Sequence, residues 1–199
     1  VLAAPPRAMA EVSIGPDPSR AALGAWVDDL CETVPIVSTH VPVETPGDLP
    51  AMLGLIGTMT QWVFHSDRIQ AGGAKVGGPS LLSCVTSDAA ALDGLDDREV
   101  ARTPCREPGR VVPEVGRLDA ERVRVVREKH ATIAATVEAT AARPEVVTQV
   151  PGLFLAGDWV RTGLPATIES AAVSARLAVA AIEAFEPPCR APLAQERAA

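Results

Sequence analysis

The residues most suited to chemistry lie between Leu153 and Ile182, in the stretch LFLAGDWVRTGLPATIESAAVSARLAVAAI. Its first four apolar residues predict a buried parallel strand. Gly157 and Asp158 follow as a turn, which leads through a short loop into a long helix rich in small residues. Gly157 permits the turn and lets a ligand approach the backbone, and the Asp158 carboxylate accepts hydrogen bonds from amides or sugar hydroxyls. A strand, a turn and a helix in this order are one way in which proteins hold a phosphate.

The start of the helix supplies the second part of this candidate site. Pro165 fits the first helical position, where its missing N–H has no intrahelical acceptor. Free amides near Ala166, Thr167 and Ile168 then point at whatever lies in front of the helix, where the dipole favours negative charge. This effect contributes about 0.3–1 kcal/mol, whereas nanomolar binding needs about 12 kcal/mol. The unit therefore orients part of a cofactor but does not hold one alone, and an ordinary strand–loop–helix crossover explains the residues equally well.

Length, composition and charge restrict the class of protein. The 199 residues suffice for one domain or one and a half, and 47% apolar residues disfavour disorder of the bulk. The net charge of −7 argues against a nucleic-acid surface. The four cysteines show no CxxC spacing and the three histidines are isolated, which predicts no metal site and favours a reducing compartment. No run approaches the ~20 apolar residues of a membrane span, and VLAAPPRAMAEV lacks the pattern of a signal peptide.

The upstream sequence predicts the elements that position this unit. Apolar and β-branched runs predict strands over Pro35–Glu44, Thr60–His65 and Ser80–Ser87, and VLAAPP predicts a short strand halted by two prolines. Helical spacing predicts a helix over Ser19–Val34. The glycine-rich loop AGGAKVGGPS precedes a strand rather than a helix, which disfavours it as a phosphate cradle.

The apolar residues between Pro35 and Ser87 should divide between the two faces of a sheet. One such face belongs either to the core or to an apolar binding wall, and Asp67 is expected in a turn beside it. The apolar residues are Val37, Val41, Val43, Leu53, Leu55, Ile56, Trp62, Phe64, Leu81 and Val85.

The segment from Asp93 to Gly152 predicts less regular structure. A helix begins near LDDREVAR, and Pro104 and Pro108 should break it. Strand and helix signals are mixed over AERVRVVREKHATI, and a loop with two X-Pro steps is expected over 135–152. On the last helix, a face of small residues is expected to pack on a sheet. Its members are Ala171, Ala172, Ala175 and Ala178.

The stretch from Arg127 to Ile182 resembles the C-terminal end of the FAD-dependent amine-oxidase and phytoene-desaturase superfamily. That end reads approximately AGDW, a short gap, TG, one residue, PAT and then EGA. This chain has AGDW at 156–159, TG at 162–163 and PAT at 165–167, with Ser170 where the superfamily has Gly. Arg143-Pro144 also fits. The chain is most similar to the squalene-associated FAD-dependent desaturases, the hydroxysqualene dehydroxylase-like group, over most of residues 1–185.

The resemblance implies an α/β fold with an α+β substrate part. The chain would be the C-terminal half of a Rossmann-like flavoprotein that lacks the N-terminal GxGxxG unit. Residues 1–15 would be a return strand of the FAD domain, and 16–140 a substrate domain with a mixed or antiparallel sheet. Residues 141–185 would be the C-terminal part of the FAD-binding domain, and 186–199 a disordered tail.

The resemblance also implies a set of FAD-binding residues. Gly157 and Asp158 would meet the pyrophosphate–ribityl region, and the amides of Ala166, Thr167 and Ile168 would lie near the N1–C2=O edge of the flavin. Because negative charge collects at that edge on reduction, a helix N-terminus there favours hydride acceptance. The implied cofactor-binding residues are Gly157, Asp158, Trp159, Pro165, Ala166, Thr167 and Ile168.

The implied function is an FAD-dependent oxidoreductase that acts on an isoprenoid, carotenoid or squalene-type substrate, with hydride transfer to or from the flavin. The flavin carries the chemistry, so no catalytic residue and no metal is assigned to this chain. Its implied partners are the apolar substrate and the N-terminal FAD-binding half, which lies in the same or a separate chain. The implied location is the cytoplasm, with or without peripheral contact to the inner face of the membrane. Two alternatives stay open: a flavin amine oxidase fragment, and a non-catalytic subunit or decayed fragment that needs a partner chain.

Overall fold

The computed structural model describes residues 1–9, 26–44, 47–72, 77–111 and 120–185, and the chain divides into two compact units. Unit 1 is Val1–Glu32 with Ile133–Ala199, and unit 2 is Thr33–Thr132. Unit 2 is thus narrower than the predicted substrate domain of residues 16–140. Two helices at its predicted margins, α3 (Trp26–Asp29) and α8 (Val137–Ala142), pack against each other within unit 1.

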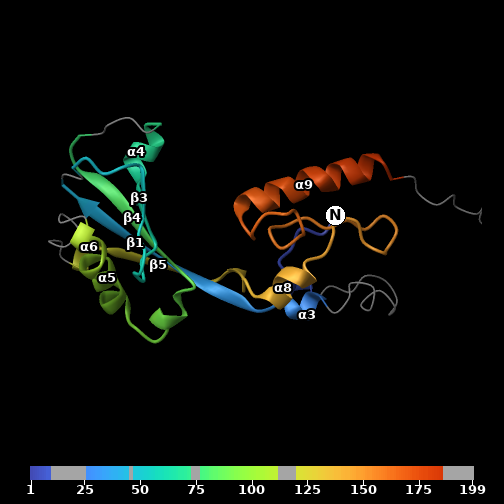
Figure 1. Ribbon diagram of the computed structural model, residues 1–199, viewed down its shortest axis with the longest axis horizontal. Coiled ribbons are helices and arrows are strands. Elements are labelled where there is room, and N and C mark those ends of the chain that lie inside the picture. Colours follow the sequence, from blue (N-terminus) through green and yellow to red (C-terminus); the bar gives the residue numbers. More distant parts are fainter. Residues whose placement is uncertain (10–25, 45–46, 73–76, 112–119, 186–199) are drawn as a thin grey trace, which may run out of the picture. The chain divides into compact units, whose positions relative to one another are not determined.

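The described residues form short helices, five strands and one long helix (Figure 1). In unit 1 these are α1 (Pro6–Met9), α3, α8 and α9 (Ile168–Glu183). In unit 2 they are β1 (Thr33–Val43), β2 (Met52–Gly54), β3 (Trp62–His65), α4 (Ser66–Gln70), β4 (Ser80–Ser87), the 3₁₀ helix η1 (Ala89–Leu92), α5 (Asp97–Arg106), α6 (Pro108–Val111), the 3₁₀ helix η2 (Ala120–Arg122) and β5 (Arg124–Ile133, whose last residue belongs to unit 1).

Unit 2 is built on a five-stranded sheet in the order β2-β3-β4-β1-β5. The pairs β2–β3, β3–β4 and β1–β4 are antiparallel. These strands confirm the predicted ones closely, and β4 has the predicted bounds. The mixed signals over 120–133 resolve into β5.

One face of this sheet carries the core of unit 2. Alternate residues of β1, β3 and β4 form a buried cluster of Val41, Val43, Val63, Leu82 and Cys84. A second cluster places Val37 against Ala89, Leu92 and Val100 of η1 and α5. Burial of one such Val or Leu side chain contributes about 1.5–3 kcal/mol, so η1 and α5 are fixed on this face by apolar contact.

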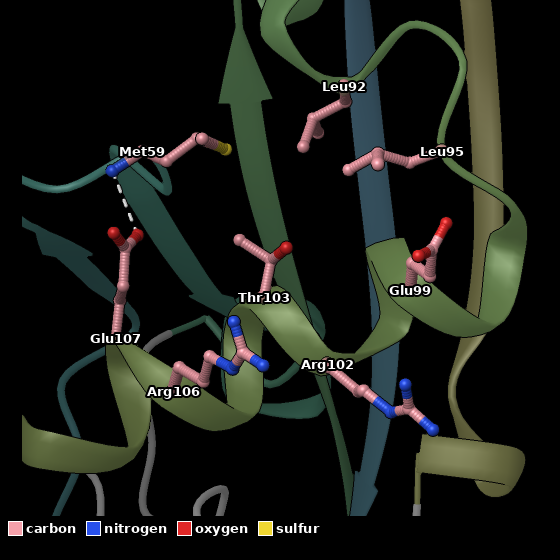
Figure 2. A pocket seen from close by; sticks show the side chains of 8 residues that line it. All are labelled: Met59, Leu92, Leu95, Glu99, Arg102, Thr103, Arg106 and Glu107. Carbon is pink, nitrogen blue, oxygen red and sulfur yellow. Dashed lines mark hydrogen bonds between the residues drawn. The ribbon is translucent and has the colours of Figure 1, made fainter.

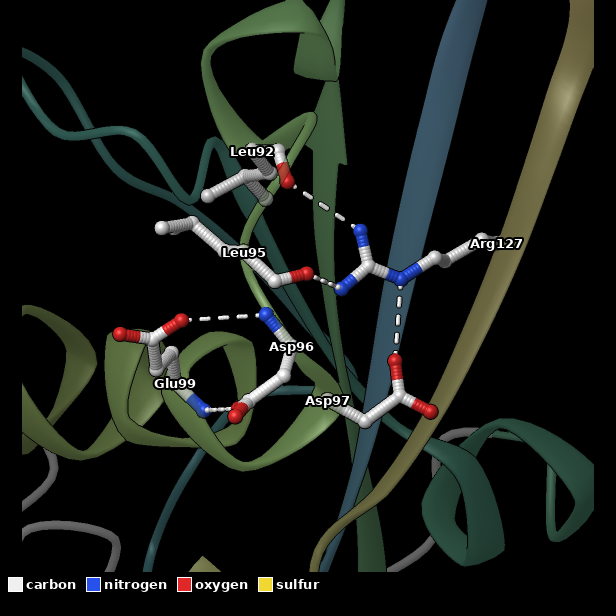
Figure 3. Close-up of polar contacts among 6 residues, drawn as sticks. All are labelled: Leu92, Leu95, Asp96, Asp97, Glu99 and Arg127. Carbon is white, nitrogen blue, oxygen red and sulfur yellow. Dashed lines mark hydrogen bonds and ion pairs between the residues drawn. The ribbon is translucent and has the colours of Figure 1, made fainter.

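Hydrogen bonds fix the start of α5 (Figure 3). Asp96 and Glu99 form a capping box, in which each side chain accepts from the other residue's amide. The Arg127 guanidinium on β5 donates to the Asp97 carboxylate and to two carbonyls just before the helix, those of Leu92 and Leu95. One side chain of the edge strand therefore connects η1 to the first turn of α5.

Two predictions about the segment 93–152 were wrong. Pro104 does not end α5, which continues to Arg106. The capping box and the buried residues Val100 and Ala101 stabilise the helix against the loss of the one backbone bond that a proline removes. Pro108 does interrupt the helix, and it occupies the first position of α6. The loop expected over 135–152 contains α8, where the Thr136 hydroxyl accepts from the Ala139 amide as an N-cap.

In unit 1, the segment Leu153–Ala156, which was predicted to be a buried strand, is largely buried. Phe154, Leu155 and Ala156 are buried, and Leu155 makes a parallel bridge with Leu2. The Leu2 amide donates to the Phe154 carbonyl at 2.8 Å, and the Ala156 amide donates to the Leu2 carbonyl at 2.9 Å. The strand predicted for VLAAPP is thus reduced to this bridge, since Pro6 begins α1.

Several predictions fall on parts of the chain that the structure does not describe. They are most of the predicted helix 19–34, residues 10–15 of the return strand, and the tail 186–199. Within the described ranges, no helix has the length and apolar character needed to cross a membrane.

Candidate functional site

The predicted Gly-Asp turn is present in unit 1, directly after the buried segment Leu153–Ala156. The Val160 amide donates to the Gly157 carbonyl at 3.3 Å, which closes the turn. The Gly157 amide itself donates to the Ser174 hydroxyl on α9 at 2.8 Å. This amide is therefore engaged by the protein and does not face a phosphate in this conformation.

The start of α9 differs from the prediction. Pro165 is not the first helical residue: the helix begins at Ile168, and Thr167 is its N-cap, whose hydroxyl accepts from the Ser170 amide at 3.2 Å. Threonine competes well for the cap position because its side chain satisfies a terminal amide, and this places Pro165 in the preceding loop. Ile168 and Glu169 then carry the first amides without intrahelical acceptors. The Ile168 side chain is 92% exposed.

Trp159 is part of the core of unit 1, although it was predicted among the cofactor-binding residues. Its exposure is 2%, and it clusters with Leu155, Val160 and Ala178. Its indole lies directly over Gly157, where an added Cβ would come within 2.8 Å of the Trp159 Cδ1. Gly157 also has a φ of +154°, so both the backbone and the packing require glycine.

Arg143 holds the loop between the turn and α9, and it is 7% exposed. Burial lowers the pKa of its guanidinium, while the nearby Asp158 charge raises this pKa. In the described ranges no carboxylate forms an ion pair with it. Its partners are the carbonyls of Asp158 (2.6 Å), Trp159 (3.3 Å), Val160 (2.6 Å) and Leu164 (2.5 Å) and the hydroxyl of Ser170 (3.0 Å).

Ser170, which stands where the superfamily has Gly, completes this arrangement. The side chain is fully buried, donates to the Asp158 carbonyl at 3.1 Å, and lies 2.7 Å from the Thr162 hydroxyl. The buried stripe of α9 consists of Ser170, Ser174 and Ala178. Ala172 and Ala175 of the predicted small face are exposed instead. The spacing of four between the three buried residues was visible in the sequence, but the prediction favoured alanine over serine.

The residues present fit one part of an FAD molecule. Hydrogen bonds from Arg143 and Ser170 hold the loop 157–167 at the N-terminus of a 16-residue helix, whose dipole favours partial negative charge. The Asp158 carboxylate is partly exposed, and it accepts no hydrogen bond from any other described residue, so it retains its capacity for hydroxyl donors. Among the described residues no cluster of His, Cys, Asp or Glu is suited to a metal ion.

Unit 2 presents a second candidate surface, on the face of its sheet opposite the core clusters. We call it the open face and define it by Ile36, Ser38, His40, Pro42, Trp62, Phe64, Leu81, Ser83 and Val85. These residues alternate with the buried ones along β1, β3 and β4, and all are partly or fully exposed. Trp62 is 44% exposed. The predicted division of the apolar residues between two faces is confirmed.

A shallow hollow of about 320 Å³ lies elsewhere in unit 2, along α5 (Figure 2). Arginines and glutamates of α5 and its C-terminal end line it together with Met59, Leu92 and Leu95. Its carboxylates are engaged: Glu107 accepts from the amides of Met59 and Thr60, and Glu99 belongs to the capping box. No residue of the predicted site lines this hollow, and its charges balance, so we assign it no function.

Asp67, expected in a turn, lies in α4. Its carboxylate accepts from the Leu81 amide at 2.8 Å, and this bond is the main reason why the pKa of Asp67 is lowered. A structural role follows for this residue.

Comparisons with known proteins agree with this architecture. The family model described as flavin-containing amine oxidoreductase matches residues 1–183. Hydroxysqualene dehydroxylase of Sinorhizobium fredii is 33% identical over 171 residues, which are 85% of this chain and 34% of that protein. The Rhodopseudomonas palustris protein of the same name is 34% identical over 172 residues, with the same coverages. The chain therefore spans about a third of the length of these relatives.

Solved structures share the fold at lower identity. A putative protoporphyrinogen oxidase from Exiguobacterium sp. 255-15 superposes with a TM-score of 0.60 and 17% identity, over 92% of this chain and 40% of that one. Putrescine oxidase with bound putrescine gives a TM-score of 0.59 and 14% identity, over 92% and 42%. FAD is the cofactor that these similarities support. Because the family model matches nearly the whole of this chain, the chain belongs to the flavin-containing amine oxidoreductases.

Proposed function

We propose that this chain is the C-terminal part of an FAD-dependent oxidoreductase that acts on a long apolar isoprenoid of the squalene or carotenoid type. The observation that carries the proposal is the loop 157–167, which Arg143 and Ser170 hold in front of α9. When bound, FAD supplies the redox chemistry. The residues of this chain bind and orient it.

The proposal assigns unit 1 to the C-terminal part of a Rossmann-like FAD domain. The parallel bridge between Leu2 and Leu155 supports this assignment, because parallel pairing is the rule in such sheets. Gly157 and Asp158 then lie beside the pyrophosphate–ribityl region, and the first amides of α9 beside the flavin. Pro165 and Ala166 shape the loop, and Thr167 caps the helix.

An N-terminal FAD-binding half, in the same or a separate chain, is the proposed partner of unit 1. Unit 1 exposes several large apolar side chains, which such a half would cover. They are Val1, Val137, Val147, Ile168 and Val179. The ADP-gripping glycine motif would be supplied by that half.

The open face of unit 2 supports the substrate class. It combines aromatic and aliphatic side chains and carries no carboxylate among its defining residues. Its two aromatic rings, Trp62 and Phe64, stack on each other with an interplanar angle of 20°, which differs from the aromatic cage typical of amine sites. A hydrocarbon gains about 25 cal/mol per Å² of buried apolar surface, so burial contributes most of its binding free energy. The curated relatives are named for a hydroxylated squalene.

The test begins with the reading frame upstream of this chain, where we expect a GxGxxG-containing half. We call the two parts together, expressed as one or two chains, the holoenzyme. The isolated chain should not retain FAD after gel filtration, and the holoenzyme should retain one per molecule. Anaerobic mixing with a squalene- or carotene-type isoprenoid should change the redox state of the flavin, seen in its visible absorbance. A response to putrescine or another amine, with none to isoprenoids, would overturn the substrate class in favour of an amine oxidase.

We expect Asp158→Ala to weaken FAD retention by the holoenzyme about tenfold or more. A lost hydrogen bond to a charged group costs about 1.5–3 kcal/mol, and 1.4 kcal/mol corresponds to tenfold in affinity. The dissociation constant of FAD measures the effect. Glu183→Ala, at the exposed C-terminal end of α9, is the control. Asp67 is unsuitable as a control because it bonds to Leu81. Equal dissociation constants for wild type and Asp158→Ala contradict the assignment of Asp158.

A further inference from the structure

We propose that His40 and Ser83, a hydrogen-bonded pair on the open face, bind the hydroxyl group of a long-chain hydrocarbon alcohol. The inference rests on the proposed function and deepens it, because it identifies the one polar feature of the substrate and the residues that recognise it. The ligand is an uncharged alcohol whose remaining surface is hydrocarbon.

The pair is formed by the register of the sheet. His40 on β1 lies directly opposite Ser83 on β4, and the His40 Nδ1 is 3.0 Å from the Ser83 Oγ. Ser66, the first residue of α4, extends the chain of hydroxyls, with its Oγ 3.2 Å from the Ser83 Oγ. All three side chains are partly buried, so three elements bring polar atoms to one point.

The His40 ring has a nitrogen that is available to hydrogen-bond a ligand. His40 Nδ1 is engaged by Ser83, but the other ring nitrogen, Nε2, makes no hydrogen bond to any residue that the structure describes. If Nδ1 accepts from Ser83, Nε2 carries the proton and donates; if Nδ1 donates, Nε2 accepts. An alcohol hydroxyl satisfies either form, because it is both a donor and an acceptor.

The surroundings of the pair are apolar on β2, β3 and β4, and on β1 the neighbours of His40 on this face are Ser38 and Pro42. In the row of the pair, Phe64 lies opposite Ser83, and Met52 lies opposite Phe64. In one neighbouring row, Val85 lies opposite Trp62 and Ser38, and in the other Leu81 lies opposite Pro42.

The aromatic side chains of this face are fixed in place. The Trp62 and Phe64 rings stack with a centroid distance of 6.0 Å. The Trp62 indole also lies over Gly54, where an added Cβ would come within 3.4 Å of the Trp62 Cζ3. Since neighbouring strands lie about 4.8 Å apart, the row from His40 to Met52 extends over roughly 14 Å, enough for several isoprene units.

This arrangement favours an alcohol over its parent hydrocarbon. A hydrocarbon laid over the open face removes water from His40 and Ser83 and leaves a polar nitrogen without a partner, which is costly. Sites built to hydrogen-bond a substrate hydroxyl reject the analogue that lacks it strongly, by up to about 10⁴–10⁵-fold when fully buried. Because His40 and Ser83 are only partly buried, we expect a smaller preference, of about 10–100-fold.

The experiment measures binding to the holoenzyme through tryptophan fluorescence, with Trp62→Phe assigning the signal to the open face. A squalene-type alcohol, the parent hydrocarbon and a long-chain amine are titrated at a constant detergent concentration. For wild type, the alcohol should bind about tenfold or more tightly than the hydrocarbon. His40→Phe should weaken only the alcohol, by about tenfold, and His40→Gln should restore part of the preference. Ser83→Ala should also weaken binding of the alcohol alone. It is a second, independent variant, so the test does not depend on the correct folding of His40→Phe.

His130→Phe is the matched control. This histidine lies on β5, is exposed and bonds to the Thr33 hydroxyl, so its replacement should leave both dissociation constants unchanged. A full preference for the alcohol in His40→Phe and Ser83→Ala overturns the inference alone, as does equal binding of alcohol and hydrocarbon by wild type. Binding of neither by wild type, or tightest binding of the amine, overturns the proposed substrate class as well.

Discussion

Arg143→Ala lowers the free energy of unfolding of the chain by about 3–5 kcal/mol, the largest effect that we expect from a substitution in unit 1. The guanidinium donates to four backbone carbonyls and one hydroxyl. Each buried acceptor that loses its donor costs about 1–3 kcal/mol, and water that enters the space recovers part of this sum. Losses of this size are exceptional for single substitutions and arise where a buried network is broken.

The urea midpoint measures this effect. The midpoint of Arg143→Lys should lie between those of wild type and Arg143→Ala, because a compact ammonium group cannot reach all five acceptors that the planar guanidinium contacts. Arg176→Ala is the control: its guanidinium is exposed and forms only a loose pair with Glu169 at 3.9 Å, so a change within about 0.5 kcal/mol is expected. If Arg143→Ala already unfolds in buffer, hydrogen exchange of Arg143→Lys locates the loss. Protection at 157–170 that equals wild type in that variant argues against the role of Arg143.

Gly157→Ala has the second large effect, a loss of about 2–4 kcal/mol in the free energy of unfolding. A β-carbon at this position meets the buried indole of Trp159, and the φ of +154° disfavours any other residue. The indole cannot move away cheaply, because Leu155, Val160 and Ala178 enclose it. The holoenzyme should also lose FAD, since the turn shifts.

A double-mutant cycle separates the collision from the backbone strain. Trp159→Leu alone creates a cavity, but the leucine side chain fills part of it, so the cost is below the ~3–5 kcal/mol of a truncation to alanine. Combined with Gly157→Ala, it should cost clearly less than the sum of the two single substitutions, because Trp159→Leu removes the indole with which the new β-carbon collides. Gly163→Ala is a useful comparison: Gly163 has a φ of +81° but nothing within 4 Å of an added Cβ, so it reports backbone strain alone. Strict additivity in the cycle counts against a collision with the indole.

Much of the fold could be predicted from local residue patterns, and the exceptions have physical reasons. Alternation of apolar residues was sufficient for β1 and β4, since one face of each strand is buried. It failed for α8, because six helical residues rely on the Thr136 cap and on contact with α3, which no local pattern reveals. It failed at Pro104, because the packing of Val100 against Val37 stabilises α5, and a local rule for proline does not include such a tertiary contact.

The candidate site shows the same division. Gly157 and Asp158 were found because a turn leaves a local signature. The network around Arg143 was missed because four of its five partners are backbone carbonyls, which carry no residue identity and lie 15 to 21 positions away. Arg143-Pro144 was visible only as a point of resemblance. The His40–Ser83 pair depends on strand register, which two separate strand predictions do not supply.

The chain leaves unit 1 after Glu32 and re-enters it at Ile133, and the Ala134 amide donates to the Glu32 carbonyl at 2.9 Å where the two crossings meet. On a ribosome, unit 2 emerges as one uninterrupted stretch and has all of its own strands before the second part of unit 1 is made. Domains that are contiguous in sequence fold as units during synthesis. The first 32 residues must therefore wait, with Leu30 and Met9 exposed, until the segment that buries them has been translated. Slow elongation through 133–183 would lengthen that exposure.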